Sequence, residues 1–231
     1  MGHYKYVNGV CYLLMPELKK AFLAQQHIQI EPLVNMVIPS HVEDLEVTAV
    51  DNNAFRNDSK LQTVTLPNTI TTICFDAFKG CKNLTSVKFY NTKDSNNKCI
   101  QIDSSAFEDC VNLEEVLCVD EPYEFTVADS AFTNCYKLSH FNGSIKTAEF
   151  EAFSNCFSLD VLLFAHEAFW RTNTFIGCKS LNTVQFLGDV KTFLPSTCLK
   201  QLKKKSVKCS ANSNIANLVY DGYKIEVFER G

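Results

Sequence analysis

The sequence lacks the features that define several large classes of protein. Its longest apolar runs, such as 161–165, are far too short to cross a bilayer. Lysine and arginine are not in excess, and the net charge of −4 with a pI near 5.7 argues against a general nucleic-acid binder. No cationic stretch followed by an apolar run and a cleavage site opens the chain, although a removed signal peptide would leave no trace. We therefore expect no membrane insertion and no nucleic-acid partner.

Motifs of catalysis are also missing. There is no glycine-rich phosphate loop, no G-x-S-x-G elbow, no H-E-x-x-H pair and no paired-carboxylate signature. The five histidines share no spacing that suggests metal ligation, and no C-x-x-C pair occurs. The sequence therefore predicts a protein that is not an enzyme and that needs neither a cofactor nor a metal.

Two residue types are abundant instead, with 18 phenylalanines and 11 cysteines against a single tryptophan. Such an excess indicates that one structural position is copied along the chain. An Ala-Phe motif does recur, followed three residues later by Cys and six residues later by Leu. Its phenylalanines, at intervals of 23, 29, 25, 21 and 22 residues, are Phe55, Phe78, Phe107, Phe132, Phe153 and Phe175. The corresponding leucines are Leu61, Leu84, Leu113, Leu138, Leu159 and Leu181.

The spacing within each unit predicts its local structure. The L-x-x-V-x-L segment alternates apolar residues, as a short strand with one buried face does. The A-F-x-x-C-x-x-L segment places apolar residues three apart, which predicts a helical or 3₁₀ turn packed inward. A unit of roughly 23 residues cannot bury its own apolar face, so stacked units must share one core. The strands then form a parallel sheet on one side of a solenoid.

The repeat resembles the BspA-like class of leucine-rich repeats, whose units contain A-F-x-x-C-x-x-L-x-x-V-x-L. Residues 66–89 match this pattern best, and residues 38–55 are a second good match. The resemblance implies a right-handed, β-rich leucine-rich-repeat solenoid with the parallel sheet on its concave face. It also implies a non-enzymatic module at the cell surface or secreted, which binds host proteins or other cells in adhesion. The alternative is an intracellular interaction scaffold, so a cytoplasmic location stays open, and many reduced thiols would suit that compartment.

The repeat pattern also suggests how the chain is organised. Residues 1–37 are expected to form an N-terminal β-hairpin cap around an Asn8-Gly9 turn. Residues 38–198 hold six clear repeats and a degenerate one. Residues 199–231 are expected to form a mixed α/β C-terminal cap, with a short helix near 214–218 between two strands. The oligomeric state is not predicted.

Two polar segments interrupt or follow the repeats. One is the insert Asn91–Lys98, and the other is the basic cluster Lys200–Lys208. Both are most simply solvated surface, since loops tolerate insertions and no aromatic residue lies among the lysines. A binding role for either segment stays open.

Five cysteines occupy one column of the repeat: Cys81, Cys110, Cys135, Cys156 and Cys178. In neighbouring coils their parallel side chains should stand ~4.8 Å apart, the strand spacing. A disulfide needs Cβ atoms about 3.8 Å apart. The column is therefore expected to contain reduced, buried thiols that pack as small hydrophobes.

Strand alternation also predicts which side chains could meet a partner. Counting the repeat leucine as position one, positions three and five should point outward. The residues selected there are Lys88, Glu115, Leu117, His140, Asn142, Val161, Leu163 and Gln185. Leu117, His140, Val161 and Leu163 are taken as the centre, because exposed aliphatic side chains in a polar grid indicate a contact patch. Two other interpretations stay open, namely a shifted register that buries these residues or scattered surface aliphatics without a role. The expected partner is a protein.

Overall fold

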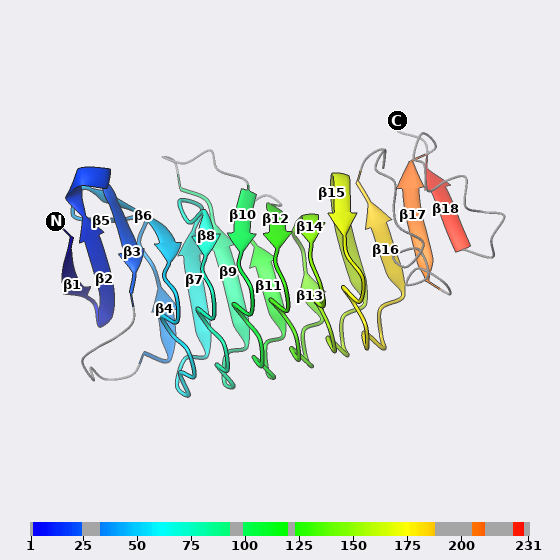
Figure 1. Cartoon of the computed structure of the whole chain (residues 1–231), viewed down its shortest axis with the longest axis horizontal. Coiled ribbons are helices and arrows are strands. Elements are labelled where there is room, and N and C mark those ends of the chain that lie inside the picture. The colour runs from blue at the N-terminus through cyan, green and yellow to red at the C-terminus, as the bar shows by residue number, and fades with distance from the viewer. Residues whose placement is uncertain are drawn as a thin grey trace.

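The computed structural model describes residues 2–24, 33–92, 99–119, 123–187, 205–210 and 224–228. The chain winds as a row of stacked coils, with a β-hairpin at its N-terminal end (Figure 1). Most coils contain one strand from each of two parallel sheets, joined by a turn. The predicted leucine-rich-repeat solenoid is confirmed.

The L-x-x-V-x-L segments form the first of these sheets, as predicted. Its five strands are hydrogen-bonded in parallel in the order β13-β11-β9-β7-β4. They are β4 (Asn35–Val37), β7 (Thr63–Pro67), β9 (Ser86–Tyr90), β11 (Glu115–Cys118) and β13 (His140–Phe141). We call this sheet, together with the equivalent segments of later coils, the leucine-side sheet.

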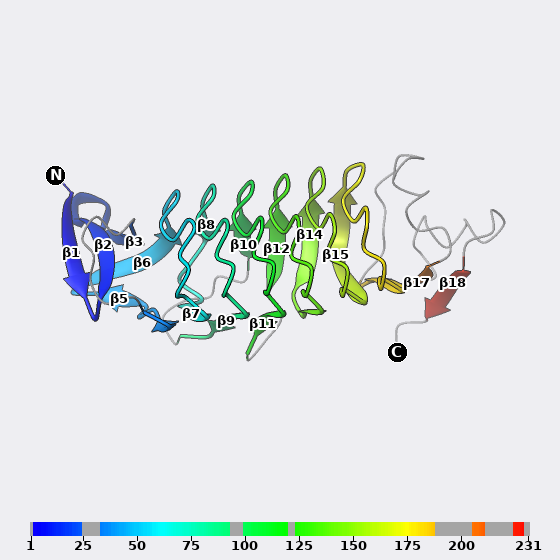
Figure 2. The same cartoon turned by 90° about the horizontal axis from the view of Figure 1, so that it is seen from below.

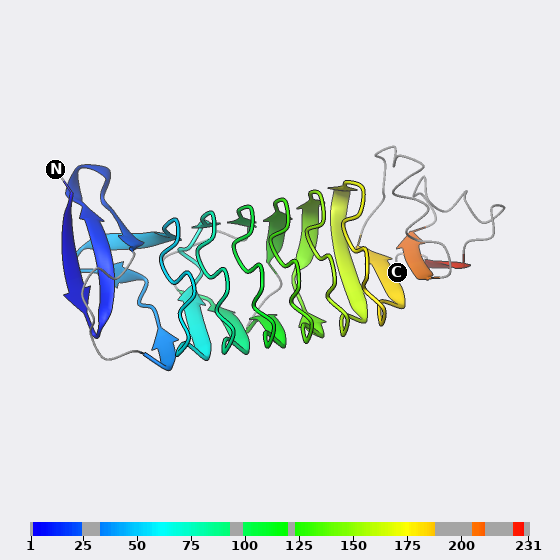
Figure 3. The same cartoon turned by 60° about the horizontal axis from the view of Figure 1, so that its bottom comes forward.

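A second parallel sheet was not predicted. It contains the residues found five positions before each repeat phenylalanine, and it lies opposite the leucine-side sheet (Figure 3). Its strands are β6 (Leu45–Val50), β8 (Thr72–Ile73), β10 (Cys99–Ile102), β12 (Glu124–Val127) and β14 (Ser144–Ala148). A two-residue strand, β5 (His41–Val42), pairs antiparallel with β6. We call this sheet the upstream sheet.

One long strand contributes to both the leucine-side sheet and the upstream sheet. The first half of β15 (Val161–Trp170) pairs with β16 (Thr183–Phe186), and its last residues pair with the end of β14. β17 (Ser206–Ser210) and β18 (Lys224–Phe228) then extend the parallel sheet beyond β16. Both strands expected near the C-terminus are therefore present. The helix expected near 214–218 lies outside the described residues, as do 93–98 of the polar insert and Lys200, Lys203 and Lys204 of the basic cluster.

The N-terminal hairpin is present. β1 (His3–Val7) and β2 (Val10–Met15) pair antiparallel around Asn8 and Gly9, which have φ values of 49° and 80°. Two consecutive left-handed residues are what a tight two-residue hairpin turn requires. After the 3₁₀ helix η1 (Pro16–Leu18), β3 (Lys20–Leu23) pairs antiparallel with β2 and parallel with β6. The hairpin is thereby joined to the upstream sheet.

The Ala-Phe segments form turns rather than helices. Bonds of the 3₁₀ type are present, such as Asp58 N to Phe55 O at 2.9 Å, but they do not propagate. The residue two after each phenylalanine is left-handed, which stops a right-handed helix. These residues are Asn57, Gly80, Asp109, Asn134, Asn155 and Gly177. Asparagine, aspartate and glycine adopt this conformation most readily. The turns form a row of loops along one side of the solenoid, which we call the turn side (Figure 2).

Successive turns are joined through side chains and backbone. The rings of Phe55, Phe78, Phe107 and Phe132 stack with centroids 5.1 Å apart at each step. The backbone N–H of Phe78 donates to Ala106 O of the next coil at 2.8 Å, and the other turns repeat this bond. The left-handed column adds a polar ladder, in which Asn134 Nδ2 donates to Asp109 Oδ1 at 2.9 Å. The turn side is therefore as regular as the sheets.

The cysteine column does more than fill space. Each Sγ donates to the carbonyl oxygen of the repeat phenylalanine in the preceding coil, at distances of 2.9, 3.1, 3.2, 3.2 and 3.0 Å along the column. Each of these carbonyls also accepts a backbone N–H of its own turn, such as Cys110 N to Phe107 O at 3.2 Å, so the thiol is a second, weaker donor to it. The first repeat has Asp58 in this column, and its carboxylate instead accepts from Lys60 N and Leu61 N.

Candidate protein-binding face

The outward face of the leucine-side sheet is the face on which the sequence placed a partner. Inward positions of this sheet are buried, for example Val64, Val87 and Val116. The outward positions three and five are exposed or half-buried, except Ser86, which is buried. The burial pattern therefore agrees with the predicted facing. We call this outward surface, from β4 through β16, the sheet face.

The structure brings the predicted site residues onto neighbouring strands of this face. In register, Leu117 of β11 lies beside Lys88 of β9, and Glu115 of β11 lies beside His140 of β13. Further along, Leu163 of β15 lies beside Gln185 of β16. Asn142 follows β13, and Val161 begins β15. The eight side chains therefore lie on two runs of paired strands, β9 to β13 and β15 to β16, in successive coils.

Glu115 is the best-connected charged residue of the sheet face. Ser86 Oγ donates to Glu115 Oε1 at 2.7 Å, and Lys88 Nζ lies 3.2 Å from the same oxygen. Partial burial alone would raise the pKa of this carboxyl, but the Ser86 hydroxyl, the Lys88 ammonium and the nearby His140 outweigh it and lower the pKa. The sheet face therefore has a fixed, paired carboxylate next to β13.

His140 is exposed and borders this pair. Its Nδ1 lies 2.8 Å from Ser139 Oγ, so a neighbour holds the ring. No acid-base chain extends from it to a buried nucleophile among the described residues. In this setting His140 is suited to hydrogen bonding with a partner.

Asn142 has an architectural function that the sequence did not reveal. Its Oδ1 accepts from Cys118 N at 2.7 Å, and its Nδ2 donates to Cys118 O at 3.1 Å. The side-chain amide thus takes the place of a backbone peptide beside the end of β11. The next residue is Gly143, where a Cβ atom would stand 2.0 Å from the ring of Phe125. Asn142 therefore maintains the sheet where β13 is short.

The aliphatic residues of the predicted centre differ in exposure. Val161 is 37% exposed, whereas Leu117 and Leu163 are half-buried. The structure adds an aliphatic residue that the sequence analysis missed, Val37 of β4, which is 71% exposed. Leu33-x-x-Met36-x-Ile38 copies the L-x-x-V-x-L pattern, and this signal could have revealed β4. The sheet face thus carries apolar side chains near both ends.

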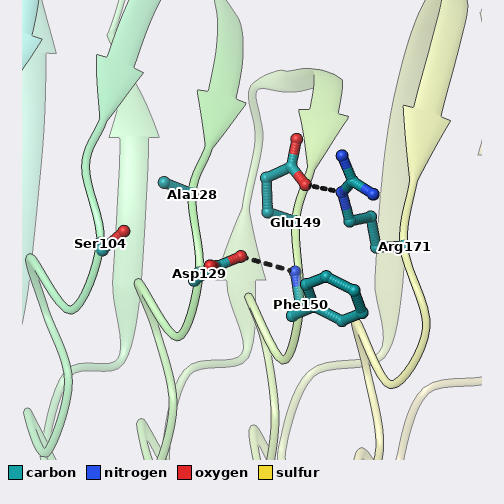
Figure 4. Close-up of a pocket in the computed structure, with 6 residues that line it drawn as sticks. All are labelled: Ser104, Ala128, Asp129, Glu149, Phe150 and Arg171. Carbon is teal, nitrogen blue, oxygen red and sulfur yellow. Dashed lines mark hydrogen bonds and ion pairs between the residues drawn. The ribbon is translucent and has the colours of Figure 1, made fainter.

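A separate depression lies where the upstream sheet passes into the turns. It encloses about 380 Å³ and is lined by Ser104, Ala128, Asp129, Glu149, Phe150 and Arg171 (Figure 4). Arg171 pairs with Glu149, and its guanidinium lies 5.4 Å from the ring centroid of Phe150. Asp129 accepts a hydrogen bond from Phe150 N at 3.0 Å. The sequence analysis missed this site because its residues do not repeat from coil to coil.

The buried thiols offer little reactivity. Burial raises the pKa of Cys110, Cys135 and Cys156 above its ordinary value, and it raises the pKa of Cys118 to about 11. A protonated thiol is a poor nucleophile and a poor metal ligand. No cysteine in the described ranges forms a disulfide, and no group of three or more His, Cys, Asp or Glu residues there could hold a metal ion. Nor does this part of the chain contain a helix of the length and hydropathy needed to span a membrane.

Repeated parallel strands, stacked phenylalanines and a thiol column define the fold as a leucine-rich-repeat solenoid. The sequence profile of the BspA type leucine rich repeat region matches in six copies, over residues 48–182 and 101–225. Because these matches span more than half of the chain, the protein belongs to this family. Members are typically non-enzymatic repeat proteins that are commonly surface-associated, and the repeat indicates protein interaction.

Solved structures agree on the fold. A leucine-rich repeat protein of T. pallidum is 18% identical with a TM-score of 0.55, covering 99% of this chain and 100% of that one. A Bacteroides ovatus leucine-rich repeat protein is 18% identical with a TM-score of 0.50, covering 96% of this chain and 67% of that one. For a Eubacterium ventriosum protein the values are 20% and 0.53, covering 84% and 51%. A search of curated protein sequences gives no match.

Proposed function

We propose that the chain is a non-enzymatic module that binds a protein through the sheet face. The observation that carries this proposal is the partly exposed row of Leu117, Val161 and Leu163 beside the paired charges of Lys88 and Glu115. Aliphatic side chains surrounded by polar groups are the usual composition of a protein interface. His140, Asn142 and Gln185 supply hydrogen-bonding groups around this centre.

The sheet face is also held rigidly before any partner arrives. The strands that carry it are paired on both sides from β7 to β11, and their inward side chains are buried in the common core. Binding to an ordered surface loses less conformational entropy than binding to a loop. The regular strands therefore favour recognition of a protein surface over enclosure of a small molecule.

We place this activity at the cell surface or in a secreted protein, in adhesion to a host protein or another cell. The support is the family, whose members are commonly surface-associated. The alternative is an intracellular scaffold, and the reduced cysteines of the described residues support it because reducing compartments keep thiols from forming disulfides. Protease treatment of intact cells separates the two, since only a surface protein is cleaved while the membrane is closed.

A pair of substitutions tests the sheet face. Val161→Asp with Leu163→Asp should abolish binding to a partner identified among host matrix proteins, because two carboxylates would be buried without partners at the interface. The matched control is Thr126→Asp with Thr147→Asp on the outward face of the upstream sheet, which should bind normally. Binding is measured by biolayer interferometry and folding by circular dichroism. Unchanged binding by the folded Val161/Leu163 variant would exclude the sheet face as the binding site.

A photo-crosslinker supplies a second, independent measurement. Placed at Leu117 it should capture the partner, and placed at Thr126 it should not. Capture at Thr126 alone would move the binding site to the upstream sheet.

A further inference from the structure

The turn side of the solenoid has two long edges of opposite charge. The first edge lies two to four residues before each repeat phenylalanine, where the upstream strands end. Its exposed or half-buried carboxylates, which we call the acidic edge, are Asp51, Asp103, Asp129, Glu149 and Glu151. At these positions the only cationic residue is Arg171, and the remaining acid, Asp76, is buried beside Arg56. Five carboxylates and one guanidinium leave this edge at −4.

The second edge lies four and five residues after each repeat phenylalanine, before the leucine-side strands begin. Its exposed cations, which we call the basic edge, are Lys60, Lys82, Lys137 and Lys179. No acidic residue occupies these positions in the six coils, so the basic edge carries +4. To the extent that the structure describes their surroundings, these lysines form no ion pair. The two charges are therefore not neutralised within the described part of the solenoid.

Large apolar side chains accompany both edges. Phe75 and Phe150, each 47% exposed, lie on the acidic edge, and Ile176, 51% exposed, lies between the edges. On the basic edge the exposed ring of Tyr136 stacks on Phe157, with centroids 5.0 Å apart. A single exposed apolar residue is ordinary. Four on one side of the solenoid, on or between two lines of opposite charge, have the composition of an interface.

We propose that the turn side binds a second copy of this chain, with the two solenoids parallel and related by a twofold axis along their length. Such an axis exchanges the two edges, so each acidic edge faces the basic edge of the other copy. A twofold axis perpendicular to the solenoids and lying in the interface would place like charges together. An axis along the solenoids places each coil opposite the same coil of the other copy. Asp129 then faces Lys137 of its own coil type, and Asp51 likewise faces Lys60.

The repeat makes a second copy the best-matched occupant. Both edges have the coil spacing of ~4.8 Å, so equivalent coils of two parallel copies face each other along the interface. Opposite charges meet within the coils of Asp51 and Asp129, and only the last coil, with Arg171 and Lys179, brings two cations together. A cationic protein would neutralise the acidic edge and be repelled by the basic edge, and a polyanion would have the opposite problem. Only a surface with both signs at the same spacing satisfies both edges, and the chain itself provides that surface.

The dimer leaves the sheet face uncovered, because that face is formed by the leucine-side strands and not by the turns. Two sheet faces in one particle would allow bivalent attachment, which strengthens binding to a clustered partner without new contacts. The dimer does not depend on the proposed function, and each can fail without the other.

Sedimentation velocity on the full chain tests the association. The Debye length is about 30 Å at 0.01 M salt and about 3 Å at 1 M salt, so charge pairing across the interface is strong only in the first condition. We expect a dimer at low salt that dissociates toward monomers as salt rises. A monomer at every concentration and salt level overturns the proposal, and so does a dimer insensitive to salt.

Charge reversal identifies the two edges. Asp103→Lys with Glu151→Lys brings the net charge of the acidic edge from −4 to zero, and Lys82→Glu with Lys137→Glu brings that of the basic edge from +4 to zero. Each variant alone should dimerise roughly tenfold or more weakly than the wild type, because neither contact then joins edges of opposite net charge. An equimolar mixture of the two should form a dimer with one copy of each, since the unchanged basic edge of one variant then faces the unchanged acidic edge of the other.

The mixture also separates a charge effect from a folding defect, because an unfolded variant could not be rescued. Matched reversals at the N-terminal end, Asp44→Lys and Lys20→Glu, should leave the wild-type dimer unchanged. Failure of the mixture to form the mixed dimer overturns the facing of the two edges. Growth into longer assemblies overturns the twofold arrangement, because only a closed pair stops at two copies.

Discussion

The thiol of each column cysteine has a specific acceptor, so cysteine is not interchangeable with other small residues here. Cys135 is fully buried and donates to Phe107 O at 3.2 Å. That carbonyl also accepts from Cys110 N at 3.2 Å, so alanine would remove one of its two donors together with the packing of the sulfur, a combined cost of about 1–3 kcal/mol. Serine would keep a donor in nearly the same place, although a hydroxyl is less apolar than a thiol.

We therefore expect Cys135→Ala to lower the free energy of unfolding by about 1–3 kcal/mol and Cys135→Ser to lower it less. Urea unfolding followed by circular dichroism measures both. Equal losses for the two variants would mean that the thiol contributes by packing alone. Asp58 is a natural contrast, because no phenylalanine turn precedes it and a carboxylate that caps its own turn replaces the thiol.

At the scale of the turn, two independent constraints act on Gly80. Its φ is +72°, and a Cβ atom there would stand 2.2 Å from Asn57 Oδ1. The left-handed conformation costs a residue with a side chain roughly 1–2 kcal/mol, and the steric clash adds to that cost. Gly80→Ala should therefore destabilise the protein by more than 1–2 kcal/mol, on the order of 2–3 kcal/mol in total.

A second substitution separates the two constraints. In an Asn57→Gly background the clash disappears and the Asn57 position tolerates glycine, so Gly80→Ala should then cost only the conformational part, roughly 1–2 kcal/mol. A double-mutant cycle from urea unfolding gives the difference. An unchanged cost in both backgrounds would show that backbone conformation alone requires the glycine.

Individual elements differed in how far the sequence could predict them. The leucine-side strands were predicted because Leu61, Val64 and Leu66 alternate clearly within one short segment. The upstream sheet was not, because a strand such as Thr72–Ile73 has one inward residue and no alternation to detect. The turn was predicted as a helical or 3₁₀ turn because Phe78, Cys81 and Leu84 are three apart, and single 3₁₀-type bonds such as Cys81 N to Phe78 O at 3.1 Å form there without a continuous helix.

The candidate site was predictable only in part for a related reason. Periodicity reveals which positions point outward, so the facing of Val161 and Leu163 followed from the repeat. It does not reveal what a side chain contacts, so the pairing of Asn142 with the Cys118 backbone was not foreseen. The charged edges of the turn side were missed for the opposite reason, because their residues vary from coil to coil and only the stacking aligns them.

The molecule as a whole has a linear architecture, in which a coil packs mainly on its two neighbours. Stability in such a protein is nearly a sum of coil and interface contributions, and opening begins where a coil has few neighbours. β17 has only β18 beyond it in the described sheet, whereas the coils of Cys110 and Cys135 are covered on both sides. Cys209 of β17, Cys110 and Cys135 are all buried in the folded protein. Their thiols therefore report the opening of different parts of one solenoid.

Pulse labelling of the cysteines with N-ethylmaleimide measures this order directly. The exposed Cys99 should react at once without denaturant and serves as the internal control. In urea well below the unfolding midpoint, Cys209 should be labelled first, Cys178 next, and Cys110 and Cys135 last, because their exposure requires central coils to separate. Mass spectrometry of the digested protein gives the extent at each position. Identical labelling of Cys209 and Cys135 at every urea concentration would instead show that the described coils unfold as one cooperative unit, with no fraying from the C-terminal end.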